Sequence, residues 1–322
     1  MKNHCYKYIL ALLSLTFCGC NAASTRPISP APSSLEVTPT ANNVTSTTKK
    51  YNYETKYADD LLSENEKLSY GNYQIEKHRK PTIVEGKRFD DDGHQFAVLK
   101  QKDKVVAQFD AIVNPLGTEI RFGLHSLLGD DRKQLIIEQT ENRGWQYWIV
   151  DLNQEAKVIH NSGKYNVEQG FRVLDLDGDG KTELIQNLLT FWFFDGLANT
   201  HSPFPDIVFT YDPKSRQYVP ANCRFRDFVL RDIEQHITKV RVAKSNAAKN
   251  DGDVPGDGDI LGAMLRVLLE YIYASKEKEA WEFYEAEYNL PDKAEMKSKI
   301  KNKLKEDAVY QAISKLKRQT SK

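Results

Sequence analysis

The sequence lacks an excess of charge of either sign, and it lacks an apolar run of membrane-spanning length. Its 322 residues contain 45 Lys and Arg against 45 Asp and Glu, so the formal net charge is zero. Nucleic-acid binding needs a basic excess or a basic stripe, so we expect no nucleic-acid partner. The apolar run at residues 8–13 falls far short of the ~20 residues that a helix needs to cross a bilayer. A Gly-rich phosphate loop and a nucleophile elbow are also missing from the sequence, and we expect no enzyme.

The first 19 residues have the design of an export signal. Lys2 and Lys7 form a charged start, and residues 8–13 form a short apolar centre. This centre leads into a run that resembles a lipobox, Leu15-Thr16-Phe17-Cys18-Gly19-Cys20. In that family a signal peptidase cuts before a cysteine that already carries lipid. The resemblance implies removal of residues 1–19, acylation of Cys20 and a membrane partner reached through a lipid anchor; the alternative is an ordinary signal peptide.

The sequence is also poor in cysteine. Of its four cysteines, Cys5 and Cys18 leave with the signal and Cys20 carries lipid, so Cys223 remains alone and no intrachain disulfide is expected. Asn21, not Asp, follows Cys20. By resemblance to Gram-negative lipoproteins, this implies a place in the cell envelope, on the outer membrane facing the periplasm.

Composition and periodicity divide the mature chain into four parts. Residues 20–50 are mostly Ser, Thr, Pro, Ala and Asn, which predicts a disordered tether. Residues 51–95 are an N-terminal segment of unclear fold, with a strand expected near residues 73–76. Residues 96–221 have the periodicity of strands, and residues 222–322 have that of two to four α-helices. The fold class is therefore α+β multidomain, with an α-helical C-terminal domain.

Three predicted hairpins and two loop-then-strand units make up residues 96–221. The hairpins share β-branched and aromatic strands around polar turns, and they cover residues 96–109, 147–159 and 207–219. The two loops lead into strands at Gln134 and Glu183, which are 49 residues apart. A period of 40 to 50 residues with several strands is typical of propeller-like arrays, so we expect an antiparallel β-repeat domain built like propeller blades.

The main candidate site is an acidic loop with the sequence Asp175-Leu176-Asp177-Gly178-Asp179-Gly180-Lys181-Thr182-Glu183. Its carboxylates stand at positions 1, 3, 5 and 9 of a tight loop, and Gly180 permits the left-handed backbone that a tight turn requires. So many carboxylates repel one another unless a cation lies between them, and an all-oxygen set suits Ca²⁺.

The surroundings of the loop exclude an EF-hand. An EF-hand requires a bidentate Glu at position 12 and helices on both sides, but Gln186 stands at position 12 and the flanking segments are predicted strands. The loop instead resembles the FG-GAP/VCBS repeat family of integrin-α-like blades, in which such loops hold calcium between strands. The resemblance implies side-chain ligation by Asp175, Asp177, Asp179 and Glu183, and ligation by the backbone carbonyl of Lys181.

The equivalent upstream loop has lost its acids. When Gln134 is aligned with Glu183, Leu128 stands at the place of Asp177, and Asp130 alone remains at the place of Asp179. We therefore expect this loop to keep the turn without the metal.

A rival interpretation is that residues 173–178 form the first motif of a haloacid-dehalogenase phosphatase. That family ends an apolar strand with Asp-x-Asp-Gly-Thr, which would make Asp175 the nucleophile and Asp177 the acid/base. Here Asp179 replaces the Thr, and no βαβ alternation surrounds the motif.

Together these features predict a lipid-anchored extracytoplasmic binding or interaction protein with one structural Ca²⁺ site, whose partner is an envelope protein or a glycan. Two alternatives stay open. One is a metal-dependent phosphohydrolase that uses Asp175 and Asp177, and the other is a structural factor in envelope assembly that acts through the helical tail.

Overall fold

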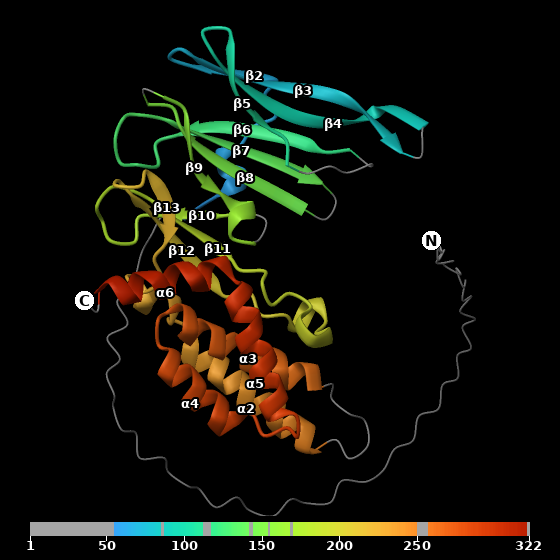
Figure 1. Ribbon diagram of the computed structural model, residues 1–322, viewed down its shortest axis with the longest axis vertical. Helices are drawn as coiled ribbons and strands as arrows, with labels where there is room; N and C mark the ends of the chain where they lie inside the picture. The colour runs from blue at the N-terminus through green and yellow to red at the C-terminus, as the bar shows by residue number, and fades with distance from the viewer. Residues whose placement is uncertain are drawn as a thin grey trace, which may run out of the picture. The chain divides into compact units, whose positions relative to one another are not determined.

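The computed structural model describes residues 55–84, 87–111, 117–141, 144–153, 155–167, 170–249 and 257–320. The predicted signal, the lipidation site at Cys20 and the tether of residues 20–50 lie outside the described residues. Residues 51–322 form one compact unit. Three antiparallel sheets followed by a helical region confirm the α+β class, and within the described residues the sheets stay separate and do not close into a propeller (Figure 1).

The first sheet has the strand order β2-β3-β4-β5, with antiparallel neighbours. Its strands are β2 (Lys67–Tyr70), β3 (Tyr73–Val84), β4 (Lys87–Gln101) and β5 (Lys104–Phe109). Lys102 and Asp103 form the two-residue turn between β4 and β5 with φ of 46° and 67°, which matches the twist of the hairpin. The predicted hairpin at residues 96–109 is therefore confirmed. We expected a boundary between residues 95 and 96, but both residues lie within β4. The first sheet therefore contains residues from both of the predicted segments, 51–95 and 96–221.

The second sheet repeats this plan with the order β6-β7-β8-β9. Its strands are β6 (Glu119–His125), β7 (Gln134–Glu141), β8 (Gly144–Asp151) and β9 (Lys157–Asn161). The third sheet adds a strand from the start of the described chain, in the order β1-β10-β11-β12-β13. Its strands are β1 (Lys56–Tyr57), β10 (Arg172–Leu174), β11 (Glu183–Asn187), β12 (Asp206–Asp212) and β13 (Gln217–Pro220). The hairpins predicted at residues 147–159 and 207–219 are present as β8–β9 and β12–β13.

Short 3-10 helices connect several strands. They are η1 (Ala58–Leu61), η2 (Ser162–Lys164), η3 (Phe194–Gly196) and η4 (Asn199–His201). The η1 helix follows β1 directly and contacts β6, so the first described residues bind both the second and the third sheets.

The described part of the tail holds six α-helices, not the two to four that the periodicity predicts. They are α1 (Arg226–Val229), α2 (Ile233–Lys249), α3 (Asp257–Tyr273), α4 (Glu277–Glu287), α5 (Lys293–Glu306) and α6 (Ala308–Thr320). Ser275, at a φ of 62°, ends the turn after α3, and Pro291 lies between α4 and α5. Asp307 separates α5 from α6 and accepts the Tyr310 backbone N–H at 2.7 Å, as an N-cap does.

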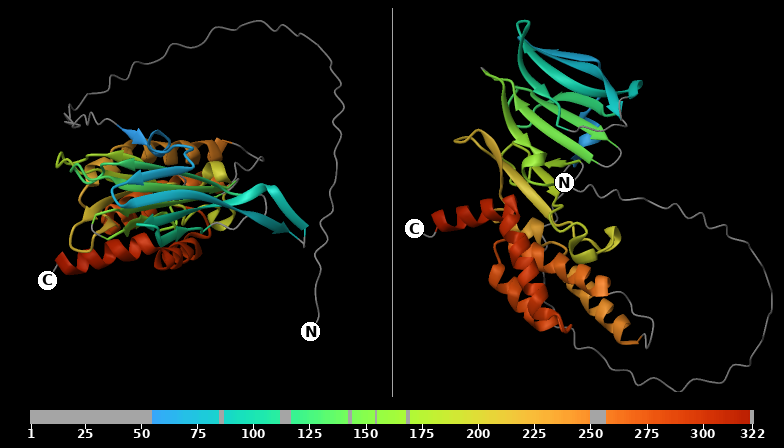
Figure 2. Two further views of the ribbon diagram at one scale, coloured as in Figure 1. Left: turned by 90° about the horizontal axis from the view of Figure 1, so that it is seen from above. Right: turned by 45° about the vertical axis from the view of Figure 1, so that its right-hand side comes forward.

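The layers follow one another in chain order, from the first sheet to the second, the third and the helices (Figures 1 and 2). Leu135 and Ile137 on β7 pack against the first sheet, whereas Ile136 between them packs toward the third sheet and the helices. Successive side chains of a strand point to opposite faces, so a strand covered on both faces needs an unbroken apolar run, as β7 has. Among the described residues, no helix has both the length and the apolar character needed to span a membrane.

Candidate metal centre

The acidic loop joins two neighbouring antiparallel strands of the third sheet. Leu174, the last residue of β10, lies opposite Glu183, the first residue of β11. The loop between them is therefore the connection of a hairpin, and its first and last carboxylates are brought together by strand pairing. No helix intervenes between these two strands.

Backbone N–H groups shape the loop around Asp175. The Asp175 carboxylate accepts hydrogen bonds from the backbone N–H of Gly178 at 2.7 Å and of Gly180 at 3.0 Å. Both glycines have a left-handed backbone, with φ of 77° and 81°, which a side chain would strain. A carboxylate has about four acceptor positions, so Asp175 can make these two bonds and still bind a cation.

Three of the four predicted carboxylate ligands converge. Asp175, Asp177 and Glu183 each place one carboxylate oxygen within 4.8 Å of the other two. Asp179 stands outside this group. Its carboxylate accepts from the Lys181 backbone N–H at 2.8 Å and from the Lys181 ammonium at 2.9 Å. The hydrogen bond from Lys181 lowers the pKa of Asp179, so this side chain is held as an anion by its neighbour in the loop.

Glu183 is the buried member of the group, with 2% of its surface exposed. One oxygen accepts the Leu176 backbone N–H at 2.9 Å, and the other accepts the Thr210 hydroxyl at 3.1 Å. Burial raises the pKa of Glu183 to about 7, and the negative charge of Asp177 acts in the same direction. A bound cation would reverse this effect, because it stabilises the ionised carboxylate.

Two contacts from outside the loop were not predicted. Arg224, which follows β13, forms an ion pair with Asp177, and Thr210 on β12 positions Glu183. Both residues are distant in sequence and carry no local motif, so only the path of the third sheet brings them to the loop. Arg224 supplies one positive charge beside three carboxylates and leaves the group with an excess of negative charge.

The donor set fits a hard divalent cation. The three converging side chains offer only carboxylate oxygen, and Glu183 and Asp175 are fixed by hydrogen bonds on their other acceptor positions. Ca²⁺ accepts six to eight oxygen ligands in flexible geometry, so it can combine these groups with backbone carbonyls and water.

The upstream loop repeats two features of the hydrogen bonding of the acidic loop, 49 residues earlier. Gln134 Oε1 accepts the Leu127 backbone N–H at 2.7 Å, just as Glu183 accepts that of Leu176. Asp130 accepts both the backbone N–H and the guanidinium of Arg132, as Asp179 does with Lys181. Leu128, at the place of Asp177, is buried in the apolar core. This loop therefore resembles the acidic loop in these contacts but lacks carboxylates at the places of Asp175, Asp177 and Glu183.

The two loops also contact each other. The backbone N–H of Thr182 donates to the Leu127 carbonyl at 2.9 Å, and the Thr182 hydroxyl donates to the same oxygen at 3.1 Å. Gly129 lies so close to the acidic loop that a Cβ at its position would be 2.6 Å from the Gly180 carbonyl oxygen. The upstream loop therefore supports the backbone that carries the candidate ligands.

Comparison with protein-family models, with curated proteins and with solved structures finds no match to this chain.

Proposed function

We propose that this chain is a lipid-anchored, extracytoplasmic binding protein whose β-sheet region is stabilised by one Ca²⁺ in the loop of residues 175–183. The observation that carries the metal site is the convergence of Asp175, Asp177 and Glu183 within 4.8 Å on a hairpin connection. In this proposal Asp179 exchanges its contact with Lys181 for the cation, and the Lys181 carbonyl completes the set. The proposal includes the anchor on Cys20 and the envelope location because residues 15–20 resemble a lipobox.

The calcium would act as a structural ion. The carboxylates that would bind it come from both ends of the acidic loop. Thr210 connects this loop to β12, and Arg224 connects it to the segment before α1. Neutralising these carboxylates removes their mutual repulsion and fixes the hairpin between β10 and β11. The shared hydrogen bonds of the two loops support an assignment of the second and third sheets as FG-GAP/VCBS-like, propeller-blade-like repeats.

Antiparallel pairing of β10 and β11 supports calcium over the phosphatase interpretation. A phosphatase of the haloacid-dehalogenase kind needs its Asp-x-Asp motif at the end of a parallel strand that continues into a helix. Here the motif leads directly into the neighbouring strand of the same hairpin.

Thermal unfolding of the purified full-length protein in calcium and in chelator tests the metal site. Ligand that binds only the folded state stabilises it by about 2.7 kcal/mol at a hundredfold excess over Kd, and extracellular sites of this kind saturate near about 1 mM calcium. We expect Asp177→Asn to abolish the calcium-dependent rise in Tm. The matched control is Asp130→Asn in the upstream loop, which should keep the full rise.

Two outcomes would contradict the proposal. Identical unfolding curves in calcium and in chelator would show that the carboxylates face water without a metal role. Magnesium-dependent turnover of p-nitrophenyl phosphate, lost in Asp175→Asn, would assign the motif to phosphoryl transfer instead.

A further inference from the structure

A cavity of about 520 Å³ lies between the second and third sheets, at a distinct place from the acidic loop. The second sheet contributes residues of β6, β7 and β8, the third contributes residues of β10 and β11, and β1 with η1 borders the cavity. This volume falls within the ~300–1,000 Å³ of small-molecule sites. The cavity is therefore large enough for a small ligand and is framed by elements from two sheets.

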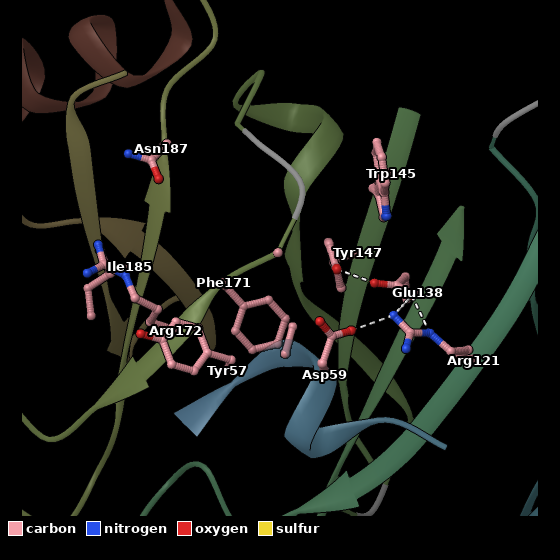
Figure 3. A pocket seen from close by; sticks show the side chains of 12 residues that line it. Tyr57, Asp59, Arg121, Glu138, Trp145, Tyr147, Phe171, Arg172, Ile185 and Asn187 are labelled. Atoms are coloured by element: carbon pink, nitrogen blue, oxygen red, sulfur yellow. Dashed lines mark hydrogen bonds and ion pairs between the residues drawn. The ribbon is translucent and has the colours of Figure 1, made fainter. Parts of the chain in front are cut away.

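The wall from the second sheet carries a buried charged network, which Figure 3 shows at close range. Glu138 on β7 is 1% exposed, and it accepts hydrogen bonds from the Tyr147 hydroxyl and from Arg121 Nε, the latter at 2.7 Å. Arg121 also reaches Asp59 of η1 at 2.7 Å. Burial raises the pKa of Glu138, although the bonds from Tyr147 and Arg121 oppose this effect. A buried carboxylate is costly unless several donors satisfy it, and this one borders a cavity.

The opposite wall adds further fixed polar groups. Arg172 on β10 pairs with Asp206 at 2.8 Å, and the Asn187 amide donates to the Phe204 carbonyl at 2.8 Å. Their remaining polar atoms are held in place by these bonds, which lowers the entropy cost of binding a ligand.

Aromatic side chains form the apolar part of the lining. Tyr147 and Phe171 are buried and pack edge to face with their ring centroids 5.2 Å apart. Trp145 is half-buried, and Tyr57 is 57% exposed, so both rings keep surface for a ligand. The lining thus combines flat apolar surface with oriented donors and acceptors.

The charges of the lining are balanced and already paired. The lining contains the guanidinium groups of Arg121 and Arg172 and the carboxylates of Asp59 and Glu138. Arg121 is paired with both of these carboxylates, and Arg172 is paired with Asp206 outside the lining. An anionic ligand would have to displace a carboxylate, and a cation would have to displace a guanidinium. A purely apolar ligand would displace the water that hydrogen-bonds to these polar groups and would offer no hydrogen bonds in its place.

A neutral sugar meets all these conditions. Its ring has an apolar C–H face that packs on aromatic rings, and its hydroxyl groups both donate and accept hydrogen bonds, so they suit carboxylate, guanidinium and amide partners together. We propose that this cavity binds a neutral saccharide, with Trp145 as the stacking surface and the Glu138–Arg121 pair as the partner of its hydroxyl groups. The site goes beyond the proposed calcium role and shares none of its residues.

Calorimetric titration of the full-length protein, in a detergent without a sugar headgroup and at saturating calcium, tests this proposal. The probes are glucose, N-acetylglucosamine, the β-1,4-linked disaccharide of each, and glucuronate as a charged analogue. We expect saturable binding of at least one neutral sugar, and weaker binding of glucuronate than of glucose. Trp145→Ala should weaken binding about tenfold or more, as loss of a central aromatic contact does.

Trp192→Ala is the matched control, because Trp192 is 39% exposed but lies outside the cavity lining. It should leave the affinity unchanged. Tyr57→Ala is a second variant. Because the Tyr57 side chain is exposed, its removal should weaken sugar binding without unfolding the protein. Absence of saturable binding by every neutral probe, tighter binding of glucuronate than of glucose, or unchanged affinity in Trp145→Ala would each overturn the proposal. These results are independent of the unfolding curves that test calcium.

Discussion

At the scale of single residues, His160 shows how burial fixes a protonation state. The imidazole lies on β9 with 2% exposure, and its Nε2 lies 2.8 Å from Oε1 of Gln186. Phe209 and Tyr218 pack against the ring, and no described residue bonds to its Nδ1. A second proton would have to enter this apolar environment. Burial therefore lowers the pKa of His160 to about 4.

This shift predicts that acid destabilises the fold through His160. Between pH 6.5, near the pKa of an unfolded histidine, and about pH 4, the imidazole takes up its extra proton only in the unfolded chain, so the contribution of His160 to the free energy of unfolding falls as pH falls through this window. The loss attributable to His160 should approach about 3 kcal/mol. Urea unfolding from pH 7.5 to 4.5 measures it. His160→Gln should remove this part of the slope, whereas His201→Gln, at an exposed position, should retain it. Parallel slopes for His160→Gln and the parent protein would contradict the prediction.

The convergence of carboxylates was predictable from local spacing alone. Asp175, Asp177 and Glu183 belong to one short loop, so their convergence depends on a tight turn. The two glycines at positions 178 and 180, which adopt a left-handed backbone, mark this turn in the sequence. The ion pair of Arg224 with Asp177 was not predictable, since it depends on the return path of β12 and β13. The cavity was missed for the same reason: its lining comes from residues between positions 57 and 187, and no single segment contains its pattern.

At the scale of elements, the upstream loop acts as a support for the acidic loop. Gly129 and Gly178 are equivalent positions with φ of 73° and 77°, so an alanine at either position meets similar backbone strain. Their surroundings differ. A Cβ at Gly129 would be 2.6 Å from the Gly180 carbonyl oxygen, whereas a Cβ at Gly178 meets nothing within 4 Å.

This pair of glycines gives a matched test of the contact between the loops. Gly178→Ala should cost about 1–2 kcal/mol of stability through backbone strain alone. Gly129→Ala should cost an additional ~1–3 kcal/mol from the clash, and it should also weaken calcium binding, although Gly129 is not a ligand. Urea unfolding at increasing calcium concentrations measures both effects. Equal losses in the two variants would show that the loops do not support each other.

Buried strands were easier to predict than strands with an exposed, charged face. Runs such as Leu135-Ile136-Ile137 are apolar because both faces of β7 are covered, and the sequence marks them clearly. The strand β2 and most of β3 were missed, since their exposed faces carry charged side chains that weaken the alternation. In the tail, periodicity found the helical faces but not the breaks at Ser275 and Asp307, which depend on single residues.

At the scale of the whole molecule, the proposed lipid anchor on Cys20 would hold the protein at a membrane. One acyl chain gives only marginal membrane binding, but the two or three chains of a lipoprotein hold firmly. Cys20→Ser should therefore leave either an uncleaved precursor or protein released into the soluble fraction. Mass spectrometry of the mature N-terminus provides the direct measurement. An unmodified first residue other than Cys20 would refute the anchor.

The apolar core is shared by the sheets and the helices. One continuous cluster joins the second sheet through Ile149, the third sheet through Phe209, and α3 through Leu268. A second cluster joins Leu176 of the acidic loop to Phe228 of α1. The α3 helix is apolar on several sides because it is surrounded, as its sequence indicates. Residues distant from the acidic loop are therefore coupled to it by packing.

This coupling predicts that calcium stabilises the helices together with the sheets. If residues 51–322 unfold as one cooperative unit, helical circular dichroism at 222 nm and tryptophan fluorescence should report the same Tm. Trp145 and Trp148 lie on β8, but Trp281 lies on α4, so fluorescence is followed in a Trp281→Phe background, where it is sensitive to the sheets. The 222 nm signal is dominated by the α-helices. Calcium should raise both transitions by the same amount, and Asp177→Asn should abolish both shifts. Asp130→Asn again serves as the control. A fluorescence transition that moves with calcium while the helical transition stays in place would show that the acidic loop stabilises only its own sheet, and that the shared core is too weak to transmit the effect to α3.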